Sequence, residues 1–430
     1  MGGEADPGTG RVPARLRIRR GRRPRRAGVR AGSGALHAPR GRPRGADRDR
    51  VRRCRGAPAG GADVGARTHR ARPPAERDGR RPGEPAAAAG GGRGAVPAAP
   101  ARRPPRRREA QPVTPGPAGR GGARVAAVVV TYNRRDLLTE ALTALRAQTR
   151  VPDRVVVIDN ASSDGTAEAV AGRFPEADLL TLPRNVGGAG GFGAGIARAL
   201  DGGADLLWLL DDDTVPEPGA LEALLAARER ATTADEGPPT LAASRVVWTD
   251  GRDHPMNTPR PKPRATAAET RVARAAGCVP IRSASFVSVL VDAAAVRERG
   301  LPVADYFLWN DDFEFTTRLL RGRRGVLCPD SVAVHKTREF GGTDADPGDR
   351  FFYEVRNKIW LFTGSPGLAP GERVLYAGST LRRWARTFAA SSDRAVLFRA
   401  MARGVGKGIS GRPRPTAALL REVGVEVPRL

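Results

Sequence analysis

The chain changes character at about Arg124, where apolar runs first appear. "RVAAVVVTYN" is a continuous, mostly β-branched run, and "RRDLLTEALTALRAQTR" after it has apolar residues at helical spacing. The first pattern is typical of a strand buried on both faces of a parallel sheet, and the second of an amphipathic helix. The alternation repeats through "DRVVVIDNASSDGT", "TAEAVAGRF", "ADLLTLPRN" and "GGAGGFGAGIARALD", and ends at "ADLLWLLDDD". It predicts an α/β fold with a mainly parallel central sheet.

The later part of the chain is less regular. "EPGALEALLAARERA" predicts a helix, and "DGRDHPMNTPRPKPRATAAETR" predicts a mobile Pro-rich loop. Strand and helix patterns return in "SASFVSVLVDAAAVRERG" and "VLCPDSVAVHKT". The last segment is helical and basic, and it either rests on an anionic membrane or forms a solvated surface. We therefore expect a tail over 1–123, an α/β catalytic domain over 124–345 and a helical extension over 346–430.

The charge of the chain is concentrated in its N-terminal segment. Residues 1–123 contain 31 Arg against nine acidic residues, which accounts for +22 of the net charge of +27. With almost no apolar side chains, this segment is expected to be disordered. It is an inert tail, the product of a misplaced start, or an arm that binds polyanions through arginine. Because it lacks aromatic residues for base stacking, we expect no specific nucleic-acid partner.

Targeting and redox signals are weak. No apolar run reaches the length of a membrane span, and the N-terminus lacks the apolar core of a signal peptide. Cys54, Cys278 and Cys328 are odd in number and show no metal-ligand spacing. We expect free thiols in a reducing compartment, which predicts a cytoplasmic protein. If the basic C-terminal segment rests on anionic lipid, the protein would also be peripheral on the inner face of the cell membrane.

Polar residues follow each of the first four predicted strands. In open α/β sheets, ligands bind beyond the carboxyl ends of the strands, so these residues are expected to share one crevice. They are Thr131, Tyr132 and Asn133, then Asp159 and Asn160, then Asn185 and Gly188, and finally Asp211, Asp212 and Asp213.

The three consecutive aspartates suggest a metal site. Alternation along an extended chain would point Asp211 and Asp213 to the same side, with Asp212 directed elsewhere, for example to a sugar hydroxyl. Two such carboxylates suit Mg²⁺ or Mn²⁺ completed by substrate phosphates. The alternatives are a solvated turn before the next helix, and the D-x-D-x-T/V nucleophile loop of haloacid-dehalogenase-type phosphatases, which normally opens its domain.

"GGAGGFGAG" contains the Gly-x-Gly-x-x-Gly spacing of dinucleotide-binding turns, but after the third strand instead of the first. It indicates either a turn that lets a nucleotide-sugar approach the backbone, or close packing of a helix on the sheet.

A second acidic group, "WNDDFEF", lies about 100 residues further on. Asp311 is the candidate general base, and Trp309, Asp312 and Glu314 are candidates to hold an acceptor. The alternative is capping of the following helix, with Asn310 as the cap. His335 ends the run "SVAVH" and is a candidate third metal ligand, although a lone histidine is more often a buried, hydrogen-bonded one.

The ordered motifs "VVVTYNR", "VVVIDNASSDGT", "RNVGGAGGFGAG", "LLWLLDDDTVPEP", "WNDDFEF" and "SVAVHKT" closely resemble the family 2 glycosyltransferases of GT-A fold, over about Val125 to Phe362. Within that family, "RNVGGAGGF", "DDD" and "RFFYEVRN" look most like actinobacterial galactofuranosyltransferases of cell-wall synthesis, and next like rhamnosyltransferases.

The resemblance implies an inverting, metal-dependent hexosyltransferase that uses a UDP- or dTDP-linked sugar and a glycan or glycolipid acceptor. By position, Thr131, Tyr132, Asn133, Asp159, Asn185, Gly188 and Asp212 would bind the donor, and Asp211, Asp213 and His335 would hold Mn²⁺ or Mg²⁺. Asp311 would be the base, or Asp312 if the loop is shifted by one, and Arg356 and Asn357 would help with diphosphate or acceptor. A functional alternative is a non-catalytic polyanion-binding protein acting through the Arg-rich arm.

Overall fold

The computed structural model describes residues 122–340 and 346–428. The expectations for the N-terminal tail fall almost entirely on 1–121, outside the described residues. The strands are β1 (Val125–Thr131), β2 (Arg154–Asp159), β3 (Asp178–Thr181), β4 (Leu206–Asp211), β5 (Thr214–Pro216), β6 (Leu241–Val247), β7 (Arg260–Pro261), β8 (Val279–Ser283), β9 (Val289–Asp292) and β10 (Gly325–His335).

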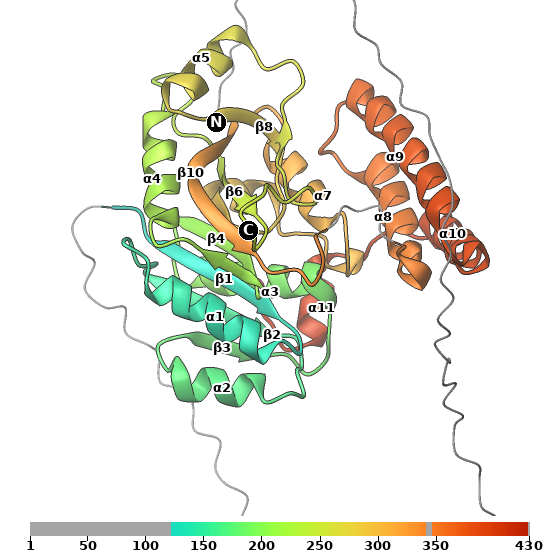
Figure 1. The fold of residues 1–430 in the computed structure, drawn as a ribbon, viewed down its shortest axis with the longest axis horizontal. Coiled ribbons are helices and arrows are strands. Elements are labelled where there is room, and N and C mark those ends of the chain that lie inside the picture. The colour runs from blue at the N-terminus through green and yellow to red at the C-terminus, as the bar shows by residue number, and fades with distance from the viewer. Residues whose placement is uncertain (1–121, 341–345, 429–430) are drawn as a thin grey trace, which may run out of the picture. The chain divides into compact units, whose positions relative to one another are not determined.

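The helices alternate with the strands in the first half and dominate the end of the chain (Figure 1). They are α1 (Arg135–Arg146), α2 (Thr166–Arg173), α3 (Gly187–Asp201), α4 (Ala220–Arg230), α5 (Ala267–Ala275), α6 (Ala293–Arg299), α7 (Asp311–Leu319), α8 (Phe351–Gly364), α9 (Pro370–Ala390), α10 (Arg394–Ser410) and α11 (Thr416–Glu422). A short 3₁₀ helix, η1 (Ala304–Tyr306), precedes α7.

The strands form one sheet in the order β3-β2-β1-β4-β9-β6-β10-β8-β7, with β5 paired to β10 off this path. The four strands predicted to be parallel are parallel to one another. Beyond β4 the sheet is mixed, because β9 is antiparallel to both β4 and β6, whereas β10 is parallel to β6. The predicted α/β class is confirmed.

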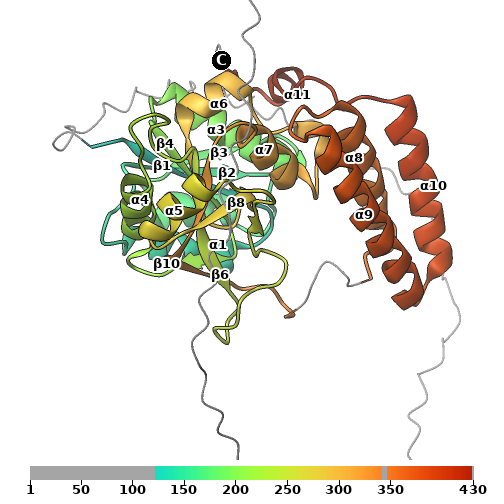
Figure 2. The ribbon, with the colours of Figure 1, turned by 90° about the horizontal axis from the view of Figure 1, so that it is seen from above.

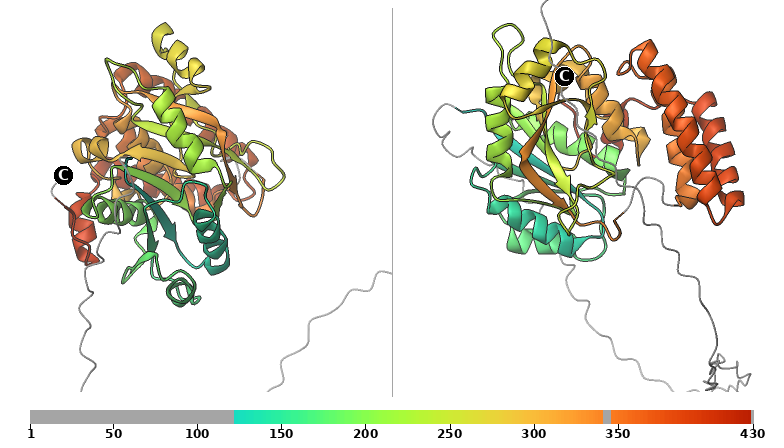
Figure 3. Two further views of the ribbon diagram at one scale, coloured as in Figure 1. Left: turned by 90° about the vertical axis from the view of Figure 1, so that its left-hand side faces the viewer. Right: turned by 45° about the horizontal axis from the view of Figure 1, so that its top comes forward.

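Both faces of the sheet are covered, which explains why β1 has no polar alternation (Figures 2 and 3). Val128 and its neighbours at spacing two join a core with α3, α6, α7 and α11. Val129 and the other alternate residues join a second core with α1, α2, α4 and α5. This arrangement leaves the carboxyl ends of β1, β2 and β4 free to carry polar side chains.

Two regions differ from the sequence-based expectation. The Pro-rich segment, expected to be a mobile loop, contains β7 and the start of α5, and His254 within it is fully buried. The C-terminal segment is helical as predicted, and α8, α9 and α10 share an apolar cluster that includes Val355 and Leu397. However, α11 returns to pack against α3 through the first core. Within the described part of the chain, no helix is both long and apolar enough to cross a membrane.

Candidate active site

Asp211, Asp213 and His335 lie together at the carboxyl edge of the sheet, with one ligand atom from each within 4.8 Å of the others. Asp211 and Asp213 were expected to point to the same side of one extended strand, but the structure brings them together in another way. Asp211 ends β4, and Asp212 and Asp213 form a turn into β5. Antiparallel pairing of β5 with β10 sets Thr214 opposite His335. The turn and this register together bring the histidine to Asp213.

The imidazole of His335 is oriented in a way that suits a metal ligand. Its Nδ1 lies 2.8 Å from the amide oxygen of Asn257, whose Nδ2 donates to Ser285 Oγ at 3.2 Å. Because an amide oxygen only accepts, Nδ1 carries the proton. The Nε2 atom then faces Asp213 Oδ1 at 2.9 Å, where it offers a lone pair to a cation or takes a second proton. A metal-bound histidine typically has such a hydrogen-bonded second nitrogen.

Asn257 comes from the Pro-rich segment, and sequence reasoning missed it. The nearby His254 packs against His335 with ring centroids 5.0 Å apart and bonds Thr337 through Nε2 at 3.0 Å. Burial and the charge of His335 lower the pKa of His254. Only the fold could reveal these contacts, because nothing in the local pattern of a Pro-rich loop marks a buried residue.

Arg134 is a second residue that sequence reasoning missed. Its guanidinium lies 3.1 Å from Asp212 Oδ1 and 2.5 Å from Asp213 Oδ2. It is half exposed, so its contribution is screened by water. The only local signal is its place directly after the polar cluster that ends the first strand. Asp212, predicted to reach a sugar hydroxyl, contacts Arg134 and lies 3.4 Å from the Tyr132 amide nitrogen.

The aspartates differ in their pKa values. Burial and the charge of Asp213 raise the pKa of Asp211 to about 7. Burial raises the pKa of Asp212 to about 6, against the charge of Arg134. For Asp213, burial acts upward, but contacts with His335 and Arg134 bring its pKa below the ordinary value. A bound cation would favour the ionised form of Asp211 against burial and the charge of Asp213, so the donor set fits a hard divalent ion.

A cavity of about 850 Å³ opens beside this cluster. Asp213 lines it together with Tyr132 and Asn133 from the first polar cluster. The rest of its wall has more cationic than acidic side chains, since Asp136, Leu137 and Asp164 lie there with Arg134, Arg135, Lys336, Arg338 and Arg350. Such a wall suits the phosphates of a nucleotide donor.

The donor-side residues predicted from β1 and β2 are close to one another. Asn133 has a φ of 53°. Its side-chain Oδ1 accepts from the Ser163 backbone N–H at 2.7 Å, and its backbone N–H donates to Ser162 Oγ at 2.9 Å. Asp159 is fully buried, and its Oδ1 accepts from the Ser162 amide at 2.9 Å, while its Oδ2 has no hydrogen-bond partner among the described residues. Thr131 is buried at the end of β1.

The glycine run of α3 mainly serves packing. A Cβ on Gly191 would meet Val130 at 2.4 Å, and one on Gly195 would meet Val128 at 2.4 Å. Gly187, at φ +76°, would clash with the carbonyl oxygen of Phe307 at 2.2 Å. A Cβ on Gly188, by contrast, would meet nothing within 4 Å. Asn185 Oδ1 accepts from the Gly187 backbone N–H at 2.7 Å, which closes an Asx turn just before the helix.

The second acidic pair opens α7. Asp311 is buried and Asp312 partly exposed. Burial and the charge of Asp312 raise the pKa of Asp311 well above its ordinary value. Burial also raises the pKa of Asp312, but the charges of Lys358 and Arg260 act to lower it. The more accessible carboxyl is therefore also the more easily ionised one.

The residues just before this pair have an unusual backbone. Phe307, Trp309 and Asn310 have φ values of 63°, 65° and 65°. For a bulky side chain this region costs on the order of 1–3 kcal/mol, and such strain is common at active sites. Trp309 is partly exposed at this bend, as its proposed contact with an acceptor requires.

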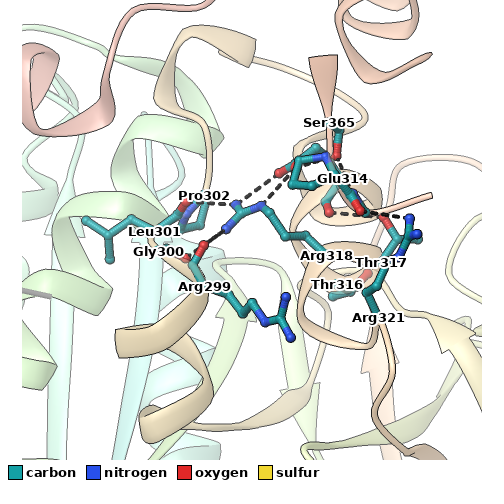
Figure 4. A network of polar contacts seen from close by, with 12 residues as sticks. Arg299, Gly300, Leu301, Pro302, Glu314, Thr316, Thr317, Arg318, Arg321 and Ser365 are labelled. Atoms are coloured by element: carbon teal, nitrogen blue, oxygen red, sulfur yellow. Dashed lines mark hydrogen bonds and ion pairs between the residues drawn. The ribbon is translucent and has the colours of Figure 1, made fainter. Parts of the chain in front are cut away.

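Glu314 does not fit its predicted role in acceptor binding. Its side chain is 2% exposed, and Arg318 binds it through two contacts of 2.9 and 3.0 Å. Ser365 Oγ donates to the same carboxylate at 2.8 Å (Figure 4). Arg318 also donates to the carbonyl of Leu301. The carboxylate is thus fully used in tying α7 to its neighbours.

Two further expectations change. Asn310 stands at the start of α7 but makes no side-chain capping bond, and its amide instead donates to Glu354 Oε2 at 2.7 Å. Asn357, expected to contact diphosphate or acceptor, is fully buried and bonds the backbone of the bend before Asp311. Arg356 likewise bonds the carbonyl oxygen of Asp305 at 2.6 Å.

The sequence of this chain is similar to those of known proteins. The profile of glycosyl transferase family 2 matches residues 126–287. Galactofuranosyltransferase GlfT1 of Mycobacterium tuberculosis is 34% identical over 284 residues, which span 60% of this chain and 86% of that protein. The chain belongs to glycosyl transferase family 2. A less similar member, the N-acetylglucosaminyl-diphospho-decaprenol L-rhamnosyltransferase of the same species, is 26% identical over 50% of this chain and 77% of that one.

Membership makes the protein a transferase that takes a sugar from a nucleotide donor, not a non-catalytic polyanion binder. Its α/β fold is of GT-A type, with a mixed sheet and a helical C-terminal part. Among solved structures, S. aureus TarS 1–349 in complex with UDP-GlcNAc aligns at 18% identity and a TM-score of 0.46, over 69% of this chain and 83% of that one.

Proposed function

We propose that this family 2 transferase is an inverting, metal-dependent galactofuranosyltransferase that acts on a hydroxyl of a glycan or lipid-linked acceptor. The observation that carries the proposal is the 34% identity to a galactofuranosyltransferase across 86% of its length. The cluster of Asp211, Asp213 and His335 supports metal dependence. Rhamnose is the second candidate sugar, supported by the weaker similarity to a rhamnosyltransferase.

The residues of the chain divide the work between two sides of the crevice. Asp211, Asp213 and His335 would hold Mn²⁺ or Mg²⁺, with Asn257 fixing the imidazole. When bound, the ion supplies Lewis-acid stabilisation of the departing nucleoside diphosphate. The cationic wall around Arg134 and Arg135 would bind the donor phosphates. Thr131, Tyr132, Asn133, Asp159, Asn185 and Gly188 remain candidates for base, ribose and sugar contacts.

We assign the general base to Asp312 and keep Asp311 as the competing candidate. A base has to be ionised and within reach of the acceptor hydroxyl. Asp312 is partly exposed and lies near the positive charges of Lys358 and Arg260, whereas Asp311 is buried with a more strongly raised pKa. Asp312 would take the acceptor proton, and buried Asp311 would hold its own proton. Trp309 would give the acceptor an apolar wall.

The acceptor side also offers a surface for an anionic membrane. On α9, Val374 is 76% and Leu381 62% exposed, and on α10 Phe398 is 61% and Ile409 75% exposed. Exposed basic residues such as Arg382, Arg399 and Lys407 lie on the same helices. Apolar side chains flanked by basic ones favour a peripheral contact with anionic lipid, which would suit a lipid-linked acceptor. A solvated helical surface is the alternative.

The test of the activity is incubation of the protein with a panel of UDP- and dTDP-linked sugars, including UDP-galactofuranose, with and without Mn²⁺. Nucleotide release that depends on acceptor, metal and UDP-galactofuranose would support the proposal. Release from dTDP-rhamnose alone would favour the second sugar. Sedimentation with anionic and zwitterionic vesicles, comparing the wild type with Val374→Ser/Leu381→Ser, tests the membrane contact.

A further inference from the structure

The backbone of the loop formed by residues 305–310 is strained. The Leu308 amide donates to the Tyr306 carbonyl oxygen at 2.6 Å, which closes a γ-turn around Phe307 with φ 63° and ψ −58°. This form of γ-turn is rare and strained. Trp309 and Asn310 then continue with positive φ. Such a chain path persists only where its surroundings hold it in place, and it leads directly into the acidic pair.

Asn357 of α8 supplies the main hold on this loop. Its Nδ2 lies 2.9 Å from each of three carbonyl oxygens, those of Tyr306, Leu308 and Trp309. An amide has two N–H groups, so one of them is shared between acceptors. The residue is fully buried, so water cannot replace these bonds. One side chain thereby fixes the carbonyls on both sides of the strained Phe307.

The neighbouring residues of α8 orient Asn357 and make further hydrogen bonds to the 305–310 loop. Arg356 donates to Asn357 Oδ1 from Nε at 3.0 Å and from a terminal nitrogen at 2.9 Å, which settles which end of the amide faces the loop. The same guanidinium donates to the carbonyl oxygens of Asp305 and Tyr306. At the far end of the loop, Asn310 donates to Glu354.

The opposite side of the 305–310 loop contacts the donor half of the crevice. The carbonyl oxygen of Phe307 approaches Gly187 so closely that a Cβ on this glycine would lie 2.2 Å from it. The loop is therefore held between α8 and the glycine turn that opens α3. A loosened loop could move the acidic pair relative to the donor without any change in the metal ligands.

We propose that Asn357 is a positioning residue for sugar transfer: it holds the 305–310 loop in the strained path that sets Asp311 and Asp312 at the crevice. The inference rests on the proposed function for its chemistry, but its structural part can be tested alone. Asn357 acts through the loop and touches no reacting atom. Its loss should lower the rate of transfer while leaving the donor and metal side intact.

The kinetic test compares Asn357→Asp with Val355→Ala. The first keeps the size of the side chain and the acceptor for Arg356 but removes the N–H donors to the loop. The second weakens the same helix on its α10 side, where Val355 is fully buried. We expect kcat of Asn357→Asp to fall about 10²-fold, as for a misplaced catalytic group, with the dissociation constant of the nucleoside diphosphate and Mn²⁺ within about twofold of wild type. Val355→Ala should lower Tm and keep its kcat at temperatures below unfolding.

Hydrogen exchange of peptides covering 305–313 supplies a readout that needs no substrate. Asn357→Asp should exchange faster there than wild type, and Val355→Ala should not. Unchanged exchange in Asn357→Asp, wild-type kcat, or an equal loss of kcat in both variants would overturn the proposal. Wild-type protein that transfers no sugar from the panel would count against the proposed function, and the exchange data would still decide the role of Asn357.

Discussion

The two acidic groups of the crevice are built for opposite purposes. Asp211 and Asp213 meet through strand register, and Arg134 and His335 face them with polar nitrogen atoms. Asp311 and Asp312 begin a helix after a strained loop and lie near Lys358. The first group gathers carboxylates that a cation can join. The second places two acids in different surroundings, with Asp311 buried and Asp312 partly exposed, and we propose that Asp312 accepts the proton. Similar sequence motifs thus acquire different chemistry from their surroundings.

The largest effect should come from breaking the first group. Asp213→Ala removes one proposed metal ligand and the partner of both His335 and Arg134. We expect transfer to fall by roughly 10³-fold or more, since the ion contributes several kcal/mol to the transition state. Calorimetric titration with Mn²⁺ and nucleoside diphosphate should show the loss of metal-dependent binding. Titration curves unchanged from wild type would refute the metal assignment.

The second group should respond differently. Asp312→Asn is expected to lower kcat by about 10²-fold or more with donor binding retained, because a base is lost but the metal side is intact. Asp311→Asn should cost less, because Asp311 is buried and the charge of Asp312 helps to raise its pKa, which disfavours its role as the base. Steady-state kinetics on the two variants decide between them. A greater loss for Asp311→Asn would restore Asp311 as the base.

A smaller effect is expected from the residue that orients the first group. Asn257→Ala leaves His335 Nδ1 without its acceptor and should weaken Mn²⁺ binding roughly 10- to 100-fold, as is usual for a partner of a metal-bound histidine. Asn257→Asp keeps an acceptor and should restore most of the affinity. Equal affinities in Asn257→Ala and wild type would show that the imidazole does not bind the ion.

The smallest change is expected from pH alone. Because burial and Asp213 raise the pKa of Asp211 to about 7, this carboxyl is protonated at lower pH and must lose its proton to bind an ion. Mn²⁺ affinity should therefore fall as pH drops from about 8 to 6, by about tenfold over the whole range, because the ionised fraction of a group with this pKa falls by that factor. Titrations at several pH values measure this, and Asp312→Asn should move the profile to lower pH, because the charge of Asp312 contributes to the raised pKa of Asp211. A flat profile would contradict ionisation of Asp211 on binding.

The donor half of the site was more predictable from sequence than the acceptor half. Parallel strands bring their carboxyl ends to one edge, so clusters such as Thr131 and Asp159 could be placed from local patterns alone. Asn257 and Asn357 could not, because their partners lie about 50 to 80 residues away in the chain and depend on tertiary packing. Glu314 failed for a related reason: it is buried against Arg318 and against Ser365, which lies 51 residues away in the chain, and no local pattern shows this packing.

The pairing of β5 with β10 has a consequence for the order in which the molecule assembles. Thr214 and His335 are opposite each other in this ladder, and a slip by one residue would turn the imidazole to the other face of the sheet. The site therefore cannot form until the last strand of the sheet has docked in register. An ion bound there would connect the turn after β4 to the end of β10, and it would slow the detachment of β10 from the sheet.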